Sequence, residues 1–364
     1  MIFDPILDIF RGKAVTVPPM DGALKPNTAL DDAPAAVEIE APDNLCSDGN
    51  RLIFSSGDQV LALDPAGGVV QEIQRFDATV TALAVSPAGD IAIGLDNGEL
   101  GLMPLDGTPH DLPATANLAC PTALAFDASG ALYVAQGSAR HRPSDWAVDL
   151  MSKNAFGSIW RIDLSGKGSA ALIYQGLAFP NGILPVPSQH GIVVSESWQH
   201  RLVGIPAHGK STPQPLLTKL PGYPARLSPA ADGGAWLALF APRNRLIEFT
   251  LLEDAYRKQM MQDVPREYWI APALASGTTF LEPLQCGGVK TMGVHKPWSP
   301  TRSYGLVVKL DASLRPVASY HSRANGRRHG VTSVAEVGGR VFAASKGGHA
   351  ILDITNAVGS EHRA

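Results

Sequence analysis

Short runs in which apolar and polar residues alternate recur along this chain, separated by turns rich in Asp, Gly and Ala. Three such units begin at Thr81 (TALAVSPAGDIAIGLDNGELGLMPL), Thr122 (TALAFDASGALYVAQGS) and Ala225 (ARLSPAADGGAWLALFAP). Alternation with a period of two is typical of strands with one buried face, and a Gly-containing turn between two such runs predicts a β-hairpin. Each unit is therefore expected to contribute at least two antiparallel strands.

Variants of this unit begin near Asp43, Asn181 and Val331, which brings the total to six. The starts are spaced by roughly 40 to 60 residues, except that the last interval is about twice as long, and four-stranded propeller blades recur with a similar period. Third and fourth strands follow most of the hairpins. We therefore predict an all-β fold, a six-bladed β-propeller, because stacking blades radially buries both sheet faces and leaves short strand edges.

The propeller is expected to occupy residues 36–354 as a single domain, with an N-terminal extension over 1–35 and a C-terminal tail over 355–364. The last unit offers three strands, so we expect residues 36–40 to supply its outer strand and close the ring.

The long interval predicts a partly helical, cap-like insertion in blade five, over about residues 241–303. Apolar residues at helical spacing predict an amphipathic helix, much of it over residues 251–263. With the aromatic and Pro-rich residues that follow it, this insertion is expected to cover the channel end where the inner strands begin; a peripheral helix that only packs on blade five is the alternative. A smaller insertion, residues 137–156, is expected to border the same opening. The residues behind these expectations are Leu246, Phe249, Leu252, Tyr256, Met260, Val264, Trp269, Pro272 and Trp298 in the first insertion, and His141, Trp146 and Asp149 in the second.

Composition narrows the class of partner. The formal net charge is −4 and 18% of residues are charged, which argues against a nucleic-acid partner. Cys46, Cys120 and Cys286 are too few and too far apart for a disulfide framework or a Cys-based zinc site. The N-terminus lacks the pattern of a secretory signal, and no apolar run is long enough for a membrane span. We expect a cytoplasmic protein that acts on small molecules, with its oligomeric state left open.

Several motifs resemble one known family. They are Phe179-Pro-Asn-Gly182, VVSES, LPGYPARLS, GGAWLAL, SYGLVVKLD and HGVTSV. In this order and spacing the chain resembles, over roughly residues 40–354, the strictosidine synthase-like group of the gluconolactonase and senescence-marker superfamily of six-bladed propellers. The resemblance implies either a calcium- or zinc-dependent lactonase or phosphotriesterase, or a metal-free enzyme that joins an amine to an aldehyde.

Residues that open the inner strands of a propeller converge at one end of its channel. Here these positions hold Asp43, Thr81, Thr122, Asn181, Ala225-Arg226 and Val331-Thr332. A carboxylate and an amide oxygen are hard ligands that suit a cation such as Ca²⁺. The resemblance implies metal-ligand roles for Asp43 and Asn181, and Thr122 stands where relatives carry a further Asn.

The clearest departure from the family is at Ala225, where relatives carry an Asp ligand, and at Arg226 beside it. This change removes a carboxylate and adds a permanent cation. Arg226 is expected to pair with Asp43, to bind an anionic substrate, or to hydrogen-bond a developing oxyanion. Asp43 itself could cap a turn, Asn181 could serve an Asn-Gly turn, and Thr122 could be an ordinary strand residue.

Two further side chains are candidates for proton transfer. Glu196 ends the second strand of unit four, where it could act as a general base or hold a loop through backbone N–H groups. His329 precedes the last unit, although an isolated His is more often structural.

From these residues we expect a small-molecule hydrolase, a lactonase or esterase, with Glu196, His329 and Arg226 as catalytic candidates. Either a divalent metal, Ca²⁺ or Zn²⁺, assists the hydrolysis, or the chain has lost part of the metal site that its relatives carry. The alternatives are a non-catalytic propeller that binds a ligand or partner, and a metal-free condensing enzyme.

Overall fold

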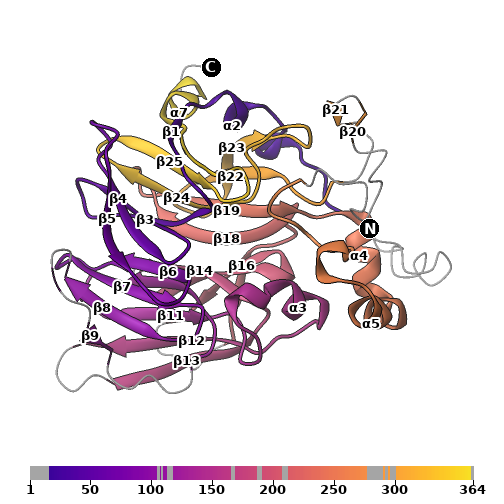
Figure 1. The fold of residues 1–364 in the computed structure, drawn as a ribbon, viewed down its shortest axis with the longest axis horizontal. Helices are drawn as coiled ribbons and strands as arrows, with labels where there is room; N and C mark the ends of the chain where they lie inside the picture. Colours follow the sequence, from indigo (N-terminus) through magenta and orange to yellow (C-terminus); the bar gives the residue numbers. More distant parts are fainter. Residues whose placement is uncertain are drawn as a thin grey trace.

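Six four-stranded antiparallel sheets form a ring, seen in the computed structural model in Figure 1. The structure describes residues 16–104, 107, 110–112, 118–164, 169–186, 191–206, 212–276, 290–291, 294–295 and 301–361. The first three blades are β2 (Pro42–Ser47), β3 (Leu52–Ser56), β4 (Gln59–Leu63) and β5 (Val70–Arg75); β6 (Val80–Val85), β7 (Asp90–Leu95), β8 (Leu100–Pro104) and β9 (His110–Asp111); and β10 (Pro121–Phe126), β11 (Leu132–Gln136), β12 (Gly157–Asp163) and β13 (Ser169–Leu177). The others are β14 (Pro180–Val186), β15 (Gly191–Glu196), β16 (Arg201–Ile205) and β17 (Gln214–Leu217); β18 (Gly222–Pro229), β19 (Ala235–Pro242), β22 (Gly305–Leu310) and β23 (Pro316–Ser322); and β24 (Val331–Val337), β25 (Arg340–Ser345), β26 (Ala350–Asp353) and β1 (Ala35–Glu38). The predicted six-bladed propeller is confirmed.

The ring closes through the strand that precedes blade one. β1 pairs antiparallel with β26, with Val37 opposite Ile351, as the sequence predicted for residues 36–40. Each inner strand contacts the inner strand of the next blade, from β2 through β6, β10, β14, β18 and β24 back to β2. Apolar side chains from neighbouring blades form the core between them; Phe54 of blade one and Phe342 of blade six, for example, share one fully buried cluster.

Every inner strand carries a register shift, a β-bulge, near the end where it begins. A bulge inserts an extra residue and redirects its side chain, and bulges are frequent beside active sites. The residues that the shifts leave unpaired are Asn44, Leu45, Thr81, Thr122, Asn181, Ala225, Arg226 and Thr332. The repeat therefore places these unpaired residues, most of which have polar side chains, at one end of the channel.

The insertion in blade five is partly helical, as predicted, and α5 (Asp254–Asp263) covers much of the predicted range 251–263. A second helix, α4 (Arg245–Leu252), precedes it and ends at Glu253, whose non-helical backbone separates the two. The apolar face indicated by the spacing is not buried in its first half, because Phe249 and Tyr256 are about half exposed. Ion pairs replace apolar contacts here: Glu248 of α4 accepts hydrogen bonds from Arg243 and lies 3.3 Å from His200 of blade four.

The remaining elements are η1 (Gly22–Leu24), α2 (Ala29–Asp32), η2 (Pro143–Asp145), α3 (Trp146–Met151), η3 (Ser197–Gln199), η4 (Arg266–Tyr268), β20 (Lys290–Thr291), β21 (Val294–His295) and α7 (Thr355–Glu361). No helix in the described ranges combines the length and apolar character needed to cross a membrane. The expectations that involve Cys286, Trp298 and residues 1–15 lie outside the described residues.

Candidate active site

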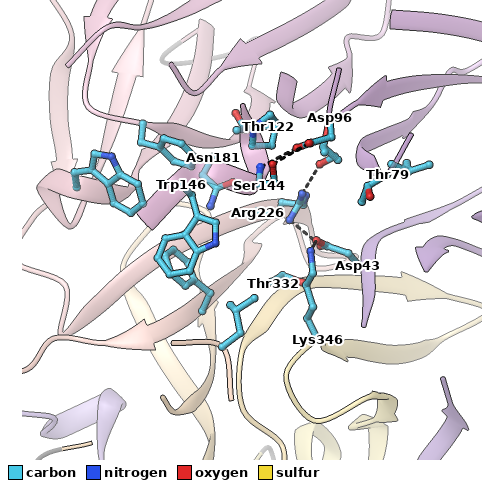
Figure 2. Close-up of a pocket in the computed structure, with 17 residues that line it drawn as sticks. Asp43, Thr79, Asp96, Thr122, Ser144, Trp146, Asn181, Arg226, Thr332 and Lys346 are labelled. Atoms are coloured by element: carbon cyan, nitrogen blue, oxygen red, sulfur yellow. Dashed lines mark hydrogen bonds and ion pairs between the residues drawn. The ribbon is translucent and has the colours of Figure 1, made fainter. Parts of the chain in front are cut away.

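The bulged ends of the inner strands open into a cavity of about 290 Å³. Figure 2 shows Asp43, Arg226 and Lys346 on one side of this cavity and Trp146 on the other. Both insertions contribute to its wall, through Trp146 of α3 and through Leu274, which follows the helices of the blade-five insertion. The prediction that both insertions border this end of the channel is therefore confirmed for these residues.

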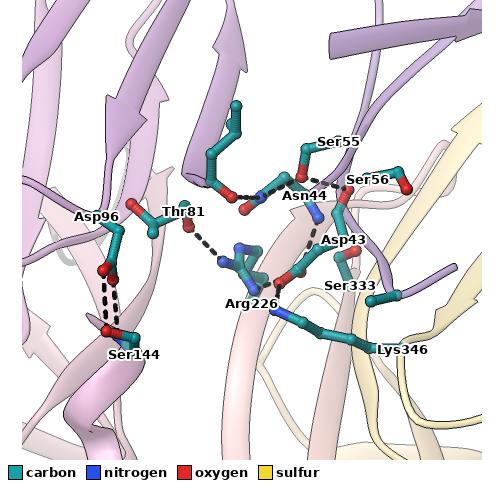
Figure 3. A network of polar contacts seen from close by, with 12 residues as sticks. Asp43, Asn44, Ser55, Ser56, Thr81, Asp96, Ser144, Arg226, Ser333 and Lys346 are labelled. Atoms are coloured by element: carbon teal, nitrogen blue, oxygen red, sulfur yellow. Dashed lines mark hydrogen bonds and ion pairs between the residues drawn. The ribbon is translucent and has the colours of Figure 1, made fainter. Parts of the chain in front are cut away.

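Asp43 is the centre of the polar side of the cavity (Figure 3). Its Oδ1 accepts hydrogen bonds from Nη1 of Arg226 at 2.8 Å and from the backbone N–H of Asn44 at 2.7 Å. Its Oδ2 accepts a hydrogen bond from Nζ of Lys346 at 2.9 Å. Both carboxylate oxygens are thus engaged, one by each cationic side chain.

These charges determine the protonation of Asp43. Burial alone would raise the pKa of this carboxyl, but the positive charges of Arg226 and Lys346 outweigh that effect and lower its pKa to about 2. Asp43 is therefore ionised at neutral pH and is a weak base.

Arg226 lies inside the channel. Its side chain lines both the cavity at the mouth and a second cavity of about 340 Å³ further along the channel, so it lies between the two. Its Nη2 donates to the carbonyl oxygen of Thr81 at 2.7 Å, while its Nε is buried without a partner in the described structure. The pairing with Asp43 expected from the sequence is present.

Ala225 differs from the expectation. It is fully buried in an apolar cluster with Tyr223 and Phe240, and it is not among the residues that line the cavity. In this chain the bulge of β18 presents the Arg226 side chain to the channel and leaves residue 225 in the core between blades.

Thr122 and Asn181 both line the cavity, but they differ in their partners. The hydroxyl of Thr122 donates to the carbonyl oxygen of Pro180 at 2.6 Å, and Thr81 makes the equivalent bond to Pro121 at 2.7 Å. This contact joins one inner strand to the next, which favours the structural alternative for Thr122. The Asn181 side chain makes no hydrogen bond to the described part of the chain and is available to a ligand.

The structure does not bring Glu196 and His329 into the cavity. The carboxylate of Glu196 is buried, where it accepts hydrogen bonds from the backbone N–H of Ala178 at 2.7 Å and from Nε of Arg201 at 2.6 Å. His329 is also buried, with Nδ1 at 2.8 Å from the Ser303 hydroxyl. Both therefore have the structural environment that the sequence left open as the alternative to catalysis.

Aromatic rings form the apolar wall of the cavity. Phe179 stacks on Trp198 with ring centroids 4.4 Å apart, and Trp146 meets Phe240 edge-on at 5.4 Å. Phe179 has a φ of 58°, a left-handed conformation that costs a non-glycine residue on the order of 1 kcal/mol or more. The buried carboxylate of Asp149 accepts a hydrogen bond from the indole Nε1 of Trp198 at 2.9 Å and so fixes the orientation of that ring.

Sequence reasoning missed Asp96 and Lys346. Both line the cavity, and each directly follows the second strand of its unit. Asp96 accepts hydrogen bonds from the backbone N–H and the hydroxyl of Ser144, both at 2.8 Å, and so holds the smaller insertion beside the channel. The signal in the sequence was a polar residue directly after the second strand of the unit, close to the position that Glu196 occupies in unit four.

Comparisons with known proteins agree with this architecture. Residues 123–204 match the strictosidine synthase family. The adipocyte plasma membrane-associated protein of Danio rerio is 24% identical over 254 residues, which cover 62% of this chain and 60% of that protein. The chain thus spans about 60% of the length of this curated relative.

Two solved propellers share the fold at low sequence identity. A gluconolactonase from Xanthomonas campestris superposes with a TM-score of 0.54 at 14% identity, covering 90% of this chain and 87% of that one. Regucalcin from Agrobacterium tumefaciens, described as a calcium-binding protein, superposes with a TM-score of 0.52 at 14% identity. The match covers 85% of this chain and 84% of that one. These findings agree with the resemblance found in the sequence: the chain is similar to the strictosidine synthase-like and gluconolactonase-like proteins, and the solved structures show that it shares their six-bladed propeller fold.

Proposed function

We propose that this cavity is the active site of a small-molecule hydrolase of the lactonase or esterase type. The observation that carries the proposal is the pair of cations, Arg226 and Lys346, held by the buried Asp43 at the polar side of a cavity with an aromatic wall. Fixed cations stabilise the negative charge that develops on a carbonyl oxygen when water attacks an ester. Asp96, the second carboxylate of the lining, is the better-placed group to orient that water, because its two hydrogen bonds come from the neutral Ser144, whereas Asp43 is paired with two cations.

The donor set does not fit a divalent cation. Both oxygens of Asp43 already accept hydrogen bonds from cationic side chains, and the hydroxyl of Thr122 is used between strands. Asn181 alone is a thin shell for an ion that takes about six to eight oxygens. Among the residues that the structure describes, no group of three or more His, Cys, Asp or Glu side chains could hold a metal. The proposed reaction therefore includes no step on the calcium or zinc ion that the resemblance implied.

A ligand-binding protein without catalysis is the second candidate. The low pKa of Asp43 favours it, because a carboxylate that stays ionised down to about pH 2 cannot accept a proton efficiently near neutrality.

Hydrolysis of dihydrocoumarin, phenyl acetate and glucono-1,5-lactone, followed by pH-stat titration in EDTA, tests the proposal. We expect turnover of at least one substrate by the wild-type protein and a loss of about 100-fold or more in kcat for Arg226→Met, the usual cost of removing one oxyanion donor. Arg75→Met, which removes an arginine from an exposed ion pair with Asp58, is the matched control and should retain full activity. Turnover that requires added calcium would replace this proposal with a metal-dependent one, and binding without turnover would support the second candidate.

A further inference from the structure

Unused hydrogen-bond donors cluster on the Asp43 side of the cavity. The hydroxyl of Thr332 is buried, with the residue 6% exposed, and although it lies close enough to Asp43 to help lower the pKa of that carboxyl, it makes no hydrogen bond of good geometry to the described residues. The ammonium group of Lys346 has three N–H donors, of which one is used by Asp43. Buried polar groups are nearly always hydrogen-bonded, so unpartnered ones that face a cavity indicate where a ligand or water binds.

The charge on this side of the cavity is positive. Arg226 and Lys346 carry two positive charges against the single negative charge of Asp43. Asp96, the other acidic residue of the lining, makes the four charged side chains of the cavity neutral in sum, but its carboxylate is held by Ser144 of the smaller insertion. The local excess of positive charge beside Lys346 and the unused donors together favour an anionic oxygen acceptor there.

The aromatic wall opposite Asp43 indicates the chemistry of the rest of the ligand. Trp146, Phe179 and Trp198 present ring faces and edges to the cavity, and Asp149 anchors one of these rings from behind. Such a wall suits a planar or aromatic body. A volume of about 290 Å³ lies at the small end of the range for small-molecule sites, about 300 to 1,000 Å³.

We infer that the cavity binds a small planar or aromatic carboxylate, with the carboxylate against Lys346 and Thr332 and the ring against Trp146 and Trp198. The inference uses the same cavity as the proposed function and rests on it for the choice of site. The carboxylate has two chemical sources: it is carried by the substrate from the start, or it is the acid that ester hydrolysis releases.

Binding without turnover tests this inference separately from catalysis. The probes are 2-naphthoate and its neutral isostere 2-naphthamide, titrated while the tryptophan fluorescence of the wild-type protein is recorded. We expect naphthoate to bind at least tenfold more tightly than naphthamide, and Lys346→Met to abolish this preference. Thr332→Val should weaken naphthoate binding by several-fold. Lys153→Met, which removes one positive charge from an exposed pair with Asp254, is the matched control and should keep the preference.

Equal affinity for naphthoate and naphthamide in the wild-type protein would overturn the inference, as would a preference that survives in Lys346→Met. Either result leaves the hydrolysis assay unaffected, so failure of this inference and failure of the proposed function are distinguishable. The source of the carboxylate follows from kinetics with dihydrocoumarin and its carboxylated analogue. A loss of activity in Lys346→Met that is greater on the carboxylated compound than on dihydrocoumarin identifies a substrate group, whereas an equal loss on both compounds together with weaker inhibition by the released acid identifies the product.

Discussion

The buried ion pair between Arg226 and Asp43 should dominate both the stability and the pH dependence of the channel. Replacing Arg226 with methionine keeps much of the side-chain volume and removes the charge. Asp43 is 5% exposed and its carboxylate is therefore largely desolvated, and in this variant Lys346 would be its one remaining cationic partner. We therefore expect a large destabilisation at neutral pH.

The magnitude follows from the structure. The pKa of Asp43 falls from 3.8 to about 2 in the folded protein, which corresponds to about 2 kcal/mol of stabilisation at neutral pH. Removing one partner of a buried pair typically costs about 3 to 5 kcal/mol, because the remaining charge is uncompensated. Since Lys346 still pairs with Asp43, we expect the lower end, about 3 kcal/mol.

The sign of the pH dependence is also determined. A carboxyl whose folded pKa is depressed contributes its full stability above its unfolded pKa and loses it as the pH falls through its folded pKa, here from about 4 towards 2. In Arg226→Met the pKa of Asp43 should be higher than in the wild-type protein, so Asp43 of the variant becomes protonated at a higher pH. The difference in stability between the two proteins should therefore shrink as the pH is lowered.

Urea unfolding at pH 7 and pH 3, followed by circular dichroism, measures both effects. Arg75→Met removes an arginine that is about half exposed and should leave the free energy of unfolding nearly unchanged at both pH values. Adding Asp43→Asn to Arg226→Met should recover part of the loss, because the unpaired charge is gone. The reasoning is refuted if Arg226→Met behaves like Arg75→Met, or if its effect is the same at both pH values.

Three further outcomes are expected. Millimolar calcium should leave the melting temperature of the wild-type protein as it is in EDTA, because both oxygens of Asp43 are engaged; a rise on adding calcium would contradict this. Gly347→Ala would bring a Cβ atom into collision with the carbonyl oxygen of Leu274, so the segment over the cavity should shift and naphthoate affinity should fall; unchanged affinity in a fluorescence titration would show that this contact does not shape the site. Asp149→Ala should lower the free energy of unfolding by about 2 kcal/mol and raise KM for aromatic esters more than it lowers kcat, since it leaves the indole of Trp198 without its acceptor; an equal loss in kcat would argue against a positioning role.

The sequence by itself determined the architecture. Alternating strands and their repeat predicted six blades, the residues that open each inner strand, and the strand that closes the ring. This is because each unit repeats the same local pattern, and one unit alone cannot bury both faces of its sheet. The pairing of Arg226 with Asp43 was also foreseen, because equivalent positions of a repeat converge in space.

The tertiary structure decided which side chains reach the cavity. Bulges redirect individual side chains, so Arg226 faces the channel while Ala225 is buried between blades. Glu196 occupies a favourable position in the repeat, but Arg201 and a backbone N–H of the same blade region engage it. Lys346 reaches Asp43 from a position 303 residues away in the chain, and no local pattern records such a contact. Strand periodicity is a property of the chain, whereas the partner of each polar side chain depends on distances that exist only once the ring has closed.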